Sequence, residues 1–84
     1  MRPHEVYLHL DLLDRVPKRG EQRRKIMEFI HNLRENPNAR GDFTDKDASL
    51  CERQIKVVGD FAITYWLDAP VGIVMIVDIR LADQ

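Results

Sequence analysis

The chain has 84 residues, of which 44% are hydrophobic and 32% are charged, and its net charge at pH 7 is −1. This length predicts a single domain over residues 1–84, and the composition is that of a soluble globular protein. The near-neutral charge excludes the strongly basic composition of an autonomous nucleic-acid-binding domain, and no apolar run approaches the roughly 18 residues that a membrane span needs.

The charge is unevenly distributed along the chain. Residues 1–40 contain nine Lys/Arg and six Asp/Glu, which gives +3, whereas residues 41–84 contain four and eight, which gives −4. The first residues, MRPHEVYLHLD, lack the apolar core of a signal peptide, and Cys51 is the single cysteine, so no internal disulfide can form. We therefore expect a protein of the reducing cytoplasm.

The first half of the chain predicts one strand and two helices. Residues 5–10 alternate apolar and polar side chains, which is typical of a short strand. Residues 12–16 fit a short helical turn that Pro17 ends. Residues 21–35 predict an amphipathic helix because apolar side chains recur at i, i+3, i+4 and i+7. This apolar face consists of Ile26, Phe29, Ile30 and Leu33.

The second half predicts three consecutive strands over residues 53–58, 61–67 and 73–79. These runs are rich in β-branched and aromatic residues, and they are separated by Gly59-Asp60 and by residues 68–72. Short turns between consecutive strands give an antiparallel meander. With the first strand, the order is β-α-α-β-β-β, an α+β domain with an antiparallel sheet of about four strands and two N-terminal helices packed on one face.

Strict alternation predicts which side chains of the last two strands share a face. One face of residues 61–67 carries Phe61, Ile63, Tyr65 and Leu67, and the other carries Ala62, Thr64 and Trp66. One face of the last strand carries Ile73, Met75, Val77 and Ile79, and the other carries Val74, Ile76, Asp78 and Arg80. Residues 38–52 form a polar connection near the length limit of a structureless loop, which we expect Phe43 or Leu50 to pin down.

Motifs for metal or nucleotide binding are not found in the sequence. His4, His9 and His31 lack the spacing of a zinc site. The acidic run from Asp42 lacks the glycine and glutamate of a calcium loop. There is no glycine-rich phosphate loop either, so we expect neither a metal nor a cofactor.

Three stretches of the sequence, taken together, form a pattern that extends over almost the whole chain. A helix closes as IHNLRENP over residues 30–37, RQIKVVGDFAITYWLD follows over 53–68, and the last strand reads IVMIVDIR over 73–80. This pattern resembles the RelE/ParE toxin superfamily of bacterial type II toxin–antitoxin systems, and AITYWLD is most similar to a ParE-like branch. The resemblance implies a RelE-like fold and the function of a growth-inhibiting toxin component.

The resemblance implies two mechanisms, ribosome-dependent mRNA cleavage (as by an mRNA interferase) or ParE-like inhibition of DNA gyrase. Members that cleave mRNA usually place an arginine directly after the Gly-x-aromatic unit, where this chain has Ala62, and a Tyr or His beyond the last arginine, where it has only residues 81–84. The alternative is a non-catalytic protein-binding module that has kept the toxin fold and lost activity.

RNA cleavage through the 2′-OH needs a base, charge stabilisation at the phosphate and an acid. The candidate site has Lys56 as base, Arg53 and Arg80 on the phosphate, and Tyr65 as acid. Alternatively, Lys56 and Arg53 are solvated strand residues, Arg80 pairs with Asp78 or with a chain end, and Tyr65 belongs to the core.

The resemblance also implies an antitoxin partner, because such toxins are usually held by an antitoxin segment that wraps the sheet and helices. This segment would cover exposed apolar surface around Trp66 and Val74. Trp66 lies opposite to the Tyr65 face, so it either caps a second small core or contacts a partner. Residues 15–25 contain six basic residues and could contact ribosomal RNA or an acidic antitoxin tail, or form a solvated helix start. The basic candidates for partner binding are Arg19, Arg23 and Arg24.

Overall fold

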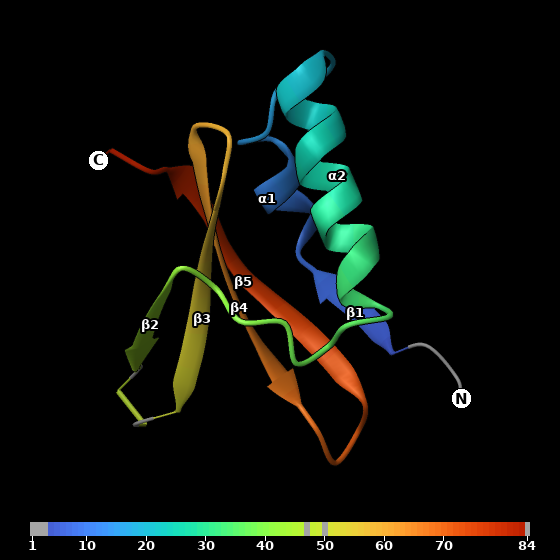
Figure 1. Cartoon of the computed structure of the whole chain (residues 1–84), viewed down its shortest axis with the longest axis vertical. Helices are drawn as coiled ribbons and strands as arrows, with labels where there is room; N and C mark the ends of the chain where they lie inside the picture. Colours follow the sequence, from blue (N-terminus) through green and yellow to red (C-terminus); the bar gives the residue numbers. More distant parts are fainter. Residues whose placement is uncertain (1–3, 47, 50, 84) are drawn as a thin grey trace.

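The computed structural model describes residues 4–46, 48–49 and 51–83. Its elements in chain order are β1 (Glu5–Leu8), α1 (Leu10–Leu13), α2 (Glu21–Leu33), β2 (Phe43–Lys46), β3 (Glu52–Val58), β4 (Phe61–Asp68) and β5 (Ile73–Leu81). Both helices lie on the same side of a twisted sheet (Figure 1). The predicted α+β fold, with two N-terminal helices on one face of the sheet, is confirmed. No helix among the described residues is long and apolar enough to cross a membrane.

The sheet has five strands in the order β1-β5-β4-β3-β2. The strands β2 to β5 pair antiparallel in sequence order, as the predicted meander requires, whereas β1 pairs parallel to β5. Relative to the predicted sheet, the structure adds β2 and makes one outer pair parallel. The alternation in residues 5–10 predicts a strand but carries no information on its direction, since both helices intervene before the sheet continues.

The additional strand, β2, lies within residues 38–52, the polar connection that the sequence predicts to be a loop. Phe43 is 61% exposed, so the expectation that it pins this connection is wrong, and Leu50 lies outside the described residues. Backbone contacts hold the connection instead. The N–H of Asp42 donates to the Ile55 carbonyl at 2.8 Å, and a Cβ on Gly41 would overlap the Ile55 backbone. Only glycine permits this close approach.

The core lies between the helices and the middle of the sheet. In α2, Ile26, Ile30 and Leu33 are buried, as the predicted apolar face requires. They join buried residues from the α1 region and from β4 and β5, namely Leu12, Val16, Phe61, Ile63, Tyr65, Val74, Ile76 and Ile79. Each fully buried aliphatic side chain contributes about 1.5–3 kcal/mol, so this cluster stabilises the fold.

A register shift in the β4–β5 pair changes which residues of β5 face the helices. Thr64 pairs with Asp78 but Tyr65 pairs with Ile76, so Val77 is an extra residue in β5. Val74, Ile76 and Ile79 are all buried, whereas Val77 is 39% exposed. The strict alternation predicted for β5 is therefore wrong beyond Ile76, because a bulge moves the later residues to the other face.

Candidate functional site

One face of the sheet is not covered by either helix, and we call it the open face. Directly paired residues lie on the same face of a sheet, and the register places Tyr7 beside Met75, Met75 beside Trp66, and Phe43 beside Ile55. Tyr7 and Phe43 are 55% and 61% exposed, and the other three are half-buried. The open face therefore carries an aromatic and aliphatic surface that spans all five strands.

Tyr65 lies on the helix-covered face and is 1% exposed. Its ring meets Phe29 edge-on with the ring centroids 5.5 Å apart, and its hydroxyl donates to the Ala39 carbonyl at 2.8 Å. Burial raises the pKa of Tyr65, and the charge of Asp42 raises it further. These contacts favour the interpretation of Tyr65 as a core residue over that of a general acid.

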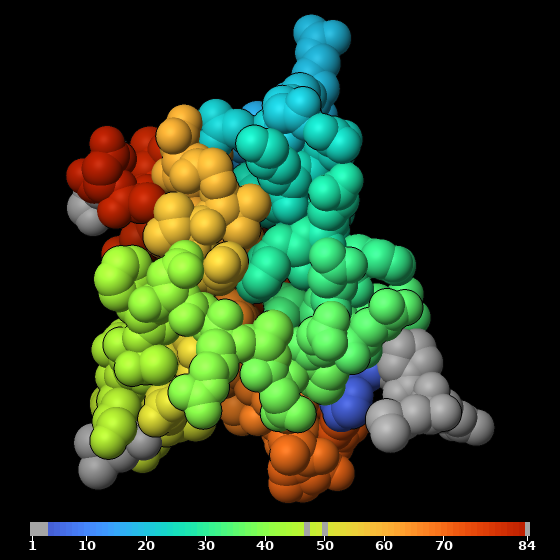
Figure 2. Space-filling view, in the orientation of Figure 1, coloured from blue at the N-terminus to red at the C-terminus, as the bar shows by residue number. Residues whose placement is uncertain are grey.

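The Tyr65 hydroxyl fastens the connection between α2 and β2 to the sheet. In Figure 2 this connection (green) lies over the middle of the sheet, beside α2. Because its backbone runs over the strands, it shields the helix-covered face of β4 from solvent. A substrate would have to displace this segment to reach the hydroxyl.

Lys56 also belongs to the helix-covered face, because it pairs with the buried Ile63. Its Nζ lies 3.4 Å from Oδ1 of Asp42. The other carboxylate oxygen of Asp42 accepts the N–H of Val57 at 2.9 Å. This backbone hydrogen bond lowers the pKa of Asp42 most, and Lys56 lowers it further. The lysine predicted as a base therefore contacts a carboxylate whose pKa lies below its ordinary value.

Arg53 and Arg80 lie on the open face, opposite to Lys56 and Tyr65. Arg53 Nη2 lies 2.7 Å from Oδ2 of Asp45, the residue it pairs with in β2. Arg80 Nε contacts Oδ2 of Asp78, as the alternative interpretation of Arg80 expects. The structure thus separates the four predicted catalytic residues into two pairs on opposite sides of the sheet.

Asp78 joins two arginines at the edge of the open face. Besides Arg80, it contacts Arg15, whose Nη1 lies 2.7 Å from Oδ1. Ala62 pairs directly with Arg80. An arginine at position 62 would therefore lie beside Arg80, where this chain has only the methyl group of Ala62.

Of the two apolar residues predicted to bind a partner, the structure leaves one partly exposed and buries the other. Trp66 is half-buried on the open face, where it pairs with Met75. Val74 is 0% exposed because it pairs with Val6 of β1 and faces the helices, so the expectation that it lies on exposed apolar surface is wrong. Tyr7 and Met75 lie on the open face instead of Val74. The alternation of β1 indicates that Tyr7 and Val6 face opposite sides, but only the pairing of β1 with β5 places Tyr7 beside Met75.

The basic residues around the start of α2 are largely engaged within the chain. Arg23 Nη1 donates to the Pro17 carbonyl at 3.2 Å, and Arg24 pairs with Glu21 and Glu28. The hydrogen bond and charge of Glu21 raise the pKa of Arg24. Arg19 is exposed. Compensated charges of this kind attract nucleic acid weakly.

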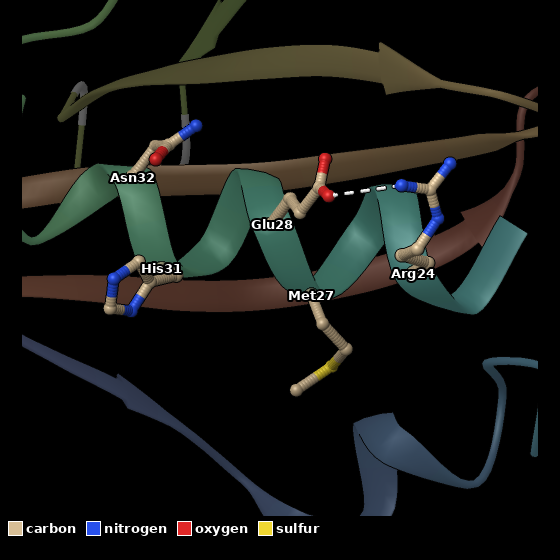
Figure 3. Close-up of a pocket in the computed structure, with 5 residues that line it drawn as sticks. All are labelled: Arg24, Met27, Glu28, His31 and Asn32. Atoms are coloured by element: carbon tan, nitrogen blue, oxygen red, sulfur yellow. Dashed lines mark hydrogen bonds and ion pairs between the residues drawn. The ribbon is translucent and has the colours of Figure 1, made fainter. Parts of the chain in front are cut away.

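A shallow hollow of about 390 Å³ lies along α2. Figure 3 shows its five lining residues, Arg24, Met27, Glu28, His31 and Asn32, all projecting from this helix. Because they come from one element, the hollow lacks the convergent polar groups of a ligand site. Among the described residues, no group of three or more His, Cys, Asp or Glu could hold a metal ion.

Comparisons with known proteins agree with this fold. No protein-family model matches the chain, and no curated protein sequence matches it. Among solved structures, the chain is similar to the archaeal RelE–RelB complex from Pyrococcus horikoshii OT3, with a TM-score of 0.72, 18% identity and coverage of 94% of both chains. This likeness establishes a RelE-like fold for almost the whole chain.

Proposed function

We propose that this chain is the toxin component of a toxin–antitoxin pair and that its open face binds both the protein target of the toxin and the antitoxin, which then blocks the target. The RelE-like fold over 94% of the chain carries this proposal. The similar solved structure is a RelE–RelB complex, which supports a protein partner for the fold.

The composition of the open face supports a protein partner over a nucleic acid. Tyr7, Trp66 and Met75 are residue types enriched in protein interfaces. The arginines of this face are paired with carboxylates of the same face, Arg53 with Asp45 and Arg80 with Asp78. Binding a phosphate backbone would require unpaired basic groups, because released counterions supply most of the affinity.

The separation of the predicted catalytic residues favours growth inhibition through a protein target, such as a ParE-like block of DNA gyrase, over ribosome-dependent mRNA cleavage. A nuclease needs its base, acid and phosphate-binding groups around one phosphodiester. Here the base and acid candidates lie on one face and the arginines on the other. Losing an acid or base typically costs 10²–10⁴-fold in rate.

The test is inducible expression of the chain in a bacterial host, with growth, the 5′ ends of mRNA and gyrase supercoiling as readouts. We expect growth arrest with intact message. The triple variant Arg53→Ala, Lys56→Ala, Arg80→Ala should still arrest growth, whereas Trp66→Asp should not. The matched control Met27→Asp places the same charge on α2, at a residue that is 36% exposed, and should retain activity.

Each outcome decides between the mechanisms. New 5′ ends that appear only on translated message, and vanish in the triple variant, would establish mRNA cleavage and overturn the protein-target mechanism. A folded, expressed chain that leaves growth unchanged would overturn the toxin proposal and leave a binding module. Arrest that survives Trp66→Asp would remove the open face from the mechanism.

A further inference from the structure

Half of β5 has a neighbouring strand on one side only. β4 runs beside β5 from Ile73 to Leu81, whereas β1 pairs only with residues 73–76. Within the part of the chain that the structure describes, no strand lies on the β1 side of residues 77–81. An unpaired strand edge is a template for pairing with another chain. We call these five residues the free edge.

The Ile79 carbonyl marks the direction in which the free edge points. Arg15 Nη1 lies 3.4 Å from this oxygen while also contacting Asp78. A side chain therefore occupies the place where a neighbouring strand would supply an N–H. The Arg15 side chain is itself 54% exposed, so it can be displaced without opening the core.

We propose that the free edge pairs with the free edge of a second copy of this chain, antiparallel and about a two-fold axis through Ile79. The free edge reads Val-Asp-Ile-Arg-Leu, which is complementary to itself in reverse. Asp78 would then lie opposite Arg80 of the second copy, twice by symmetry, and Val77 opposite Leu81 of the second copy. Opposite charges and apolar residues that face each other across a strand pair are stabilising, and such an interface is of the self-complementary kind found in two-fold dimers.

The side chains at the two ends of the free edge are available for this pairing. Val77 and Leu81 are 39% and 40% exposed, although both are aliphatic. Pairing would cover them and join the two five-stranded sheets into one continuous sheet. In the dimer, residues 77–81 of β5 would have a neighbouring strand on both sides.

The length of the free edge fits a strand from a second copy. In this register, Ile76 would lie opposite Ala82 of the second copy, but β1 already occupies that place through Leu8. β5 ends at Leu81, and the N–H of the next residue, Ala82, donates to the Asp60 carbonyl at 2.8 Å on the β4 side of the strand. The second copy therefore needs only the five residues that are free.

The dimer would be weak, because the five-residue contact is small and Arg15 must leave its place. It would also leave the open face accessible, so it goes beyond the proposed antitoxin binding and is measured separately from growth inhibition. Its test is sedimentation velocity of the full chain over a wide concentration range. We expect the mass to rise with concentration from 9.9 kDa toward twice that value.

Charge variants of the free edge give the sharper test. Arg80→Asp places Asp opposite Asp at both symmetric positions, and we expect the association constant to fall roughly tenfold or more. The control Lys25→Asp makes the same charge change at an exposed residue of α2 and should associate as the natural chain does. Asp78→Arg should also remain monomeric alone, yet an equimolar mixture of Asp78→Arg and Arg80→Asp should form a one-to-one dimer, because both cross-chain pairs are then Arg–Asp.

Three results would overturn the proposal: a natural chain that stays monomeric throughout, association that Arg80→Asp leaves unchanged, or a mixture that stays monomeric although both variants are folded by circular dichroism. A monomeric natural chain would leave the free edge for a strand of another protein. Should Asp78→Arg fail to fold, the comparison of Arg80→Asp with Lys25→Asp decides the question alone.

Discussion

Replacing Tyr65 by phenylalanine separates the two roles considered for this residue. The substitution keeps the ring against Phe29 and removes only the hydroxyl, which donates to the Ala39 carbonyl at 2.8 Å. A hydrogen bond of this kind contributes about 0.5–1.5 kcal/mol net, and a carbonyl left unpaired moves the cost toward the upper value. We therefore expect the free energy of unfolding to fall by about 1 kcal/mol and Tm by about 4–8 °C in a domain of this size.

The assay is urea unfolding followed by circular dichroism and by the fluorescence of Trp66, the single tryptophan of the chain. Tyr7→Phe is the matched control, because Tyr7 is 55% exposed and loss of a solvated hydroxyl should change stability by less than about 0.5 kcal/mol. Growth inhibition by Tyr65→Phe should be the same as that by the natural chain.

Two results would refute this reasoning. Unchanged stability of Tyr65→Phe would mean that the hydroxyl does not hold the connection between α2 and β2. A loss of growth inhibition by a factor of about 10²–10⁴, the cost of losing a general acid, with stability preserved, would return Tyr65 to a catalytic role.

Three further substitutions and one control test the fold. Ile26→Ala should cost about 2–5 kcal/mol because Ile26 is 0% exposed, whereas Met27→Ala on the outer side of α2 should cost little, both measured by urea unfolding. Gly41→Ala should destabilise the chain by about 1–3 kcal/mol, because the new Cβ overlaps the Ile55 backbone, and hydrogen exchange should show the pairing of β2 loosened first. The hydrogen bond from Val57 lowers the pKa of Asp42. Its contribution to stability is therefore fully present above the usual carboxyl pKa of about 3.9 and is lost as the pH falls through the lowered pKa. Asp42→Asn should make the free energy of unfolding less dependent on pH below about pH 4, as measured by thermal melts across pH.

The elements that bury a periodic apolar face could be predicted from the sequence. The i, i+3, i+4 and i+7 spacing from Ile26 defines α2 because the same residues form the core. The meander could be predicted because its turns are short and its strands are rich in β-branched residues. By contrast, β2 has four exposed residues and is held by backbone pairing with β3, and backbone pairing leaves no periodic signal in the side chains.

The candidate site depended on which face each strand residue occupies, and faces follow from register. Lys56 and Arg53 are three positions apart in one strand, so alternation alone places them on opposite faces. Beyond Ile76, the extra Val77 reverses the alternation of β5, which turns Asp78 and Arg80 toward the open face. A bulge belongs to a pair of strands, so neither strand sequence reveals it alone.

The parallel pairing of β1 with β5 has a consequence for synthesis on the ribosome. These strands lie at opposite ends of the described chain, and Val74, Ile76 and Ile79 form much of the surface that α1 and α2 cover. The N-terminal strand and both helices are therefore made long before the strand that completes their core, and contacts between distant segments form slowly. The nascent chain consequently exposes the apolar side of α2 until β5 has been made. The finished sheet, and any activity that requires it, arises only after β5 has been made.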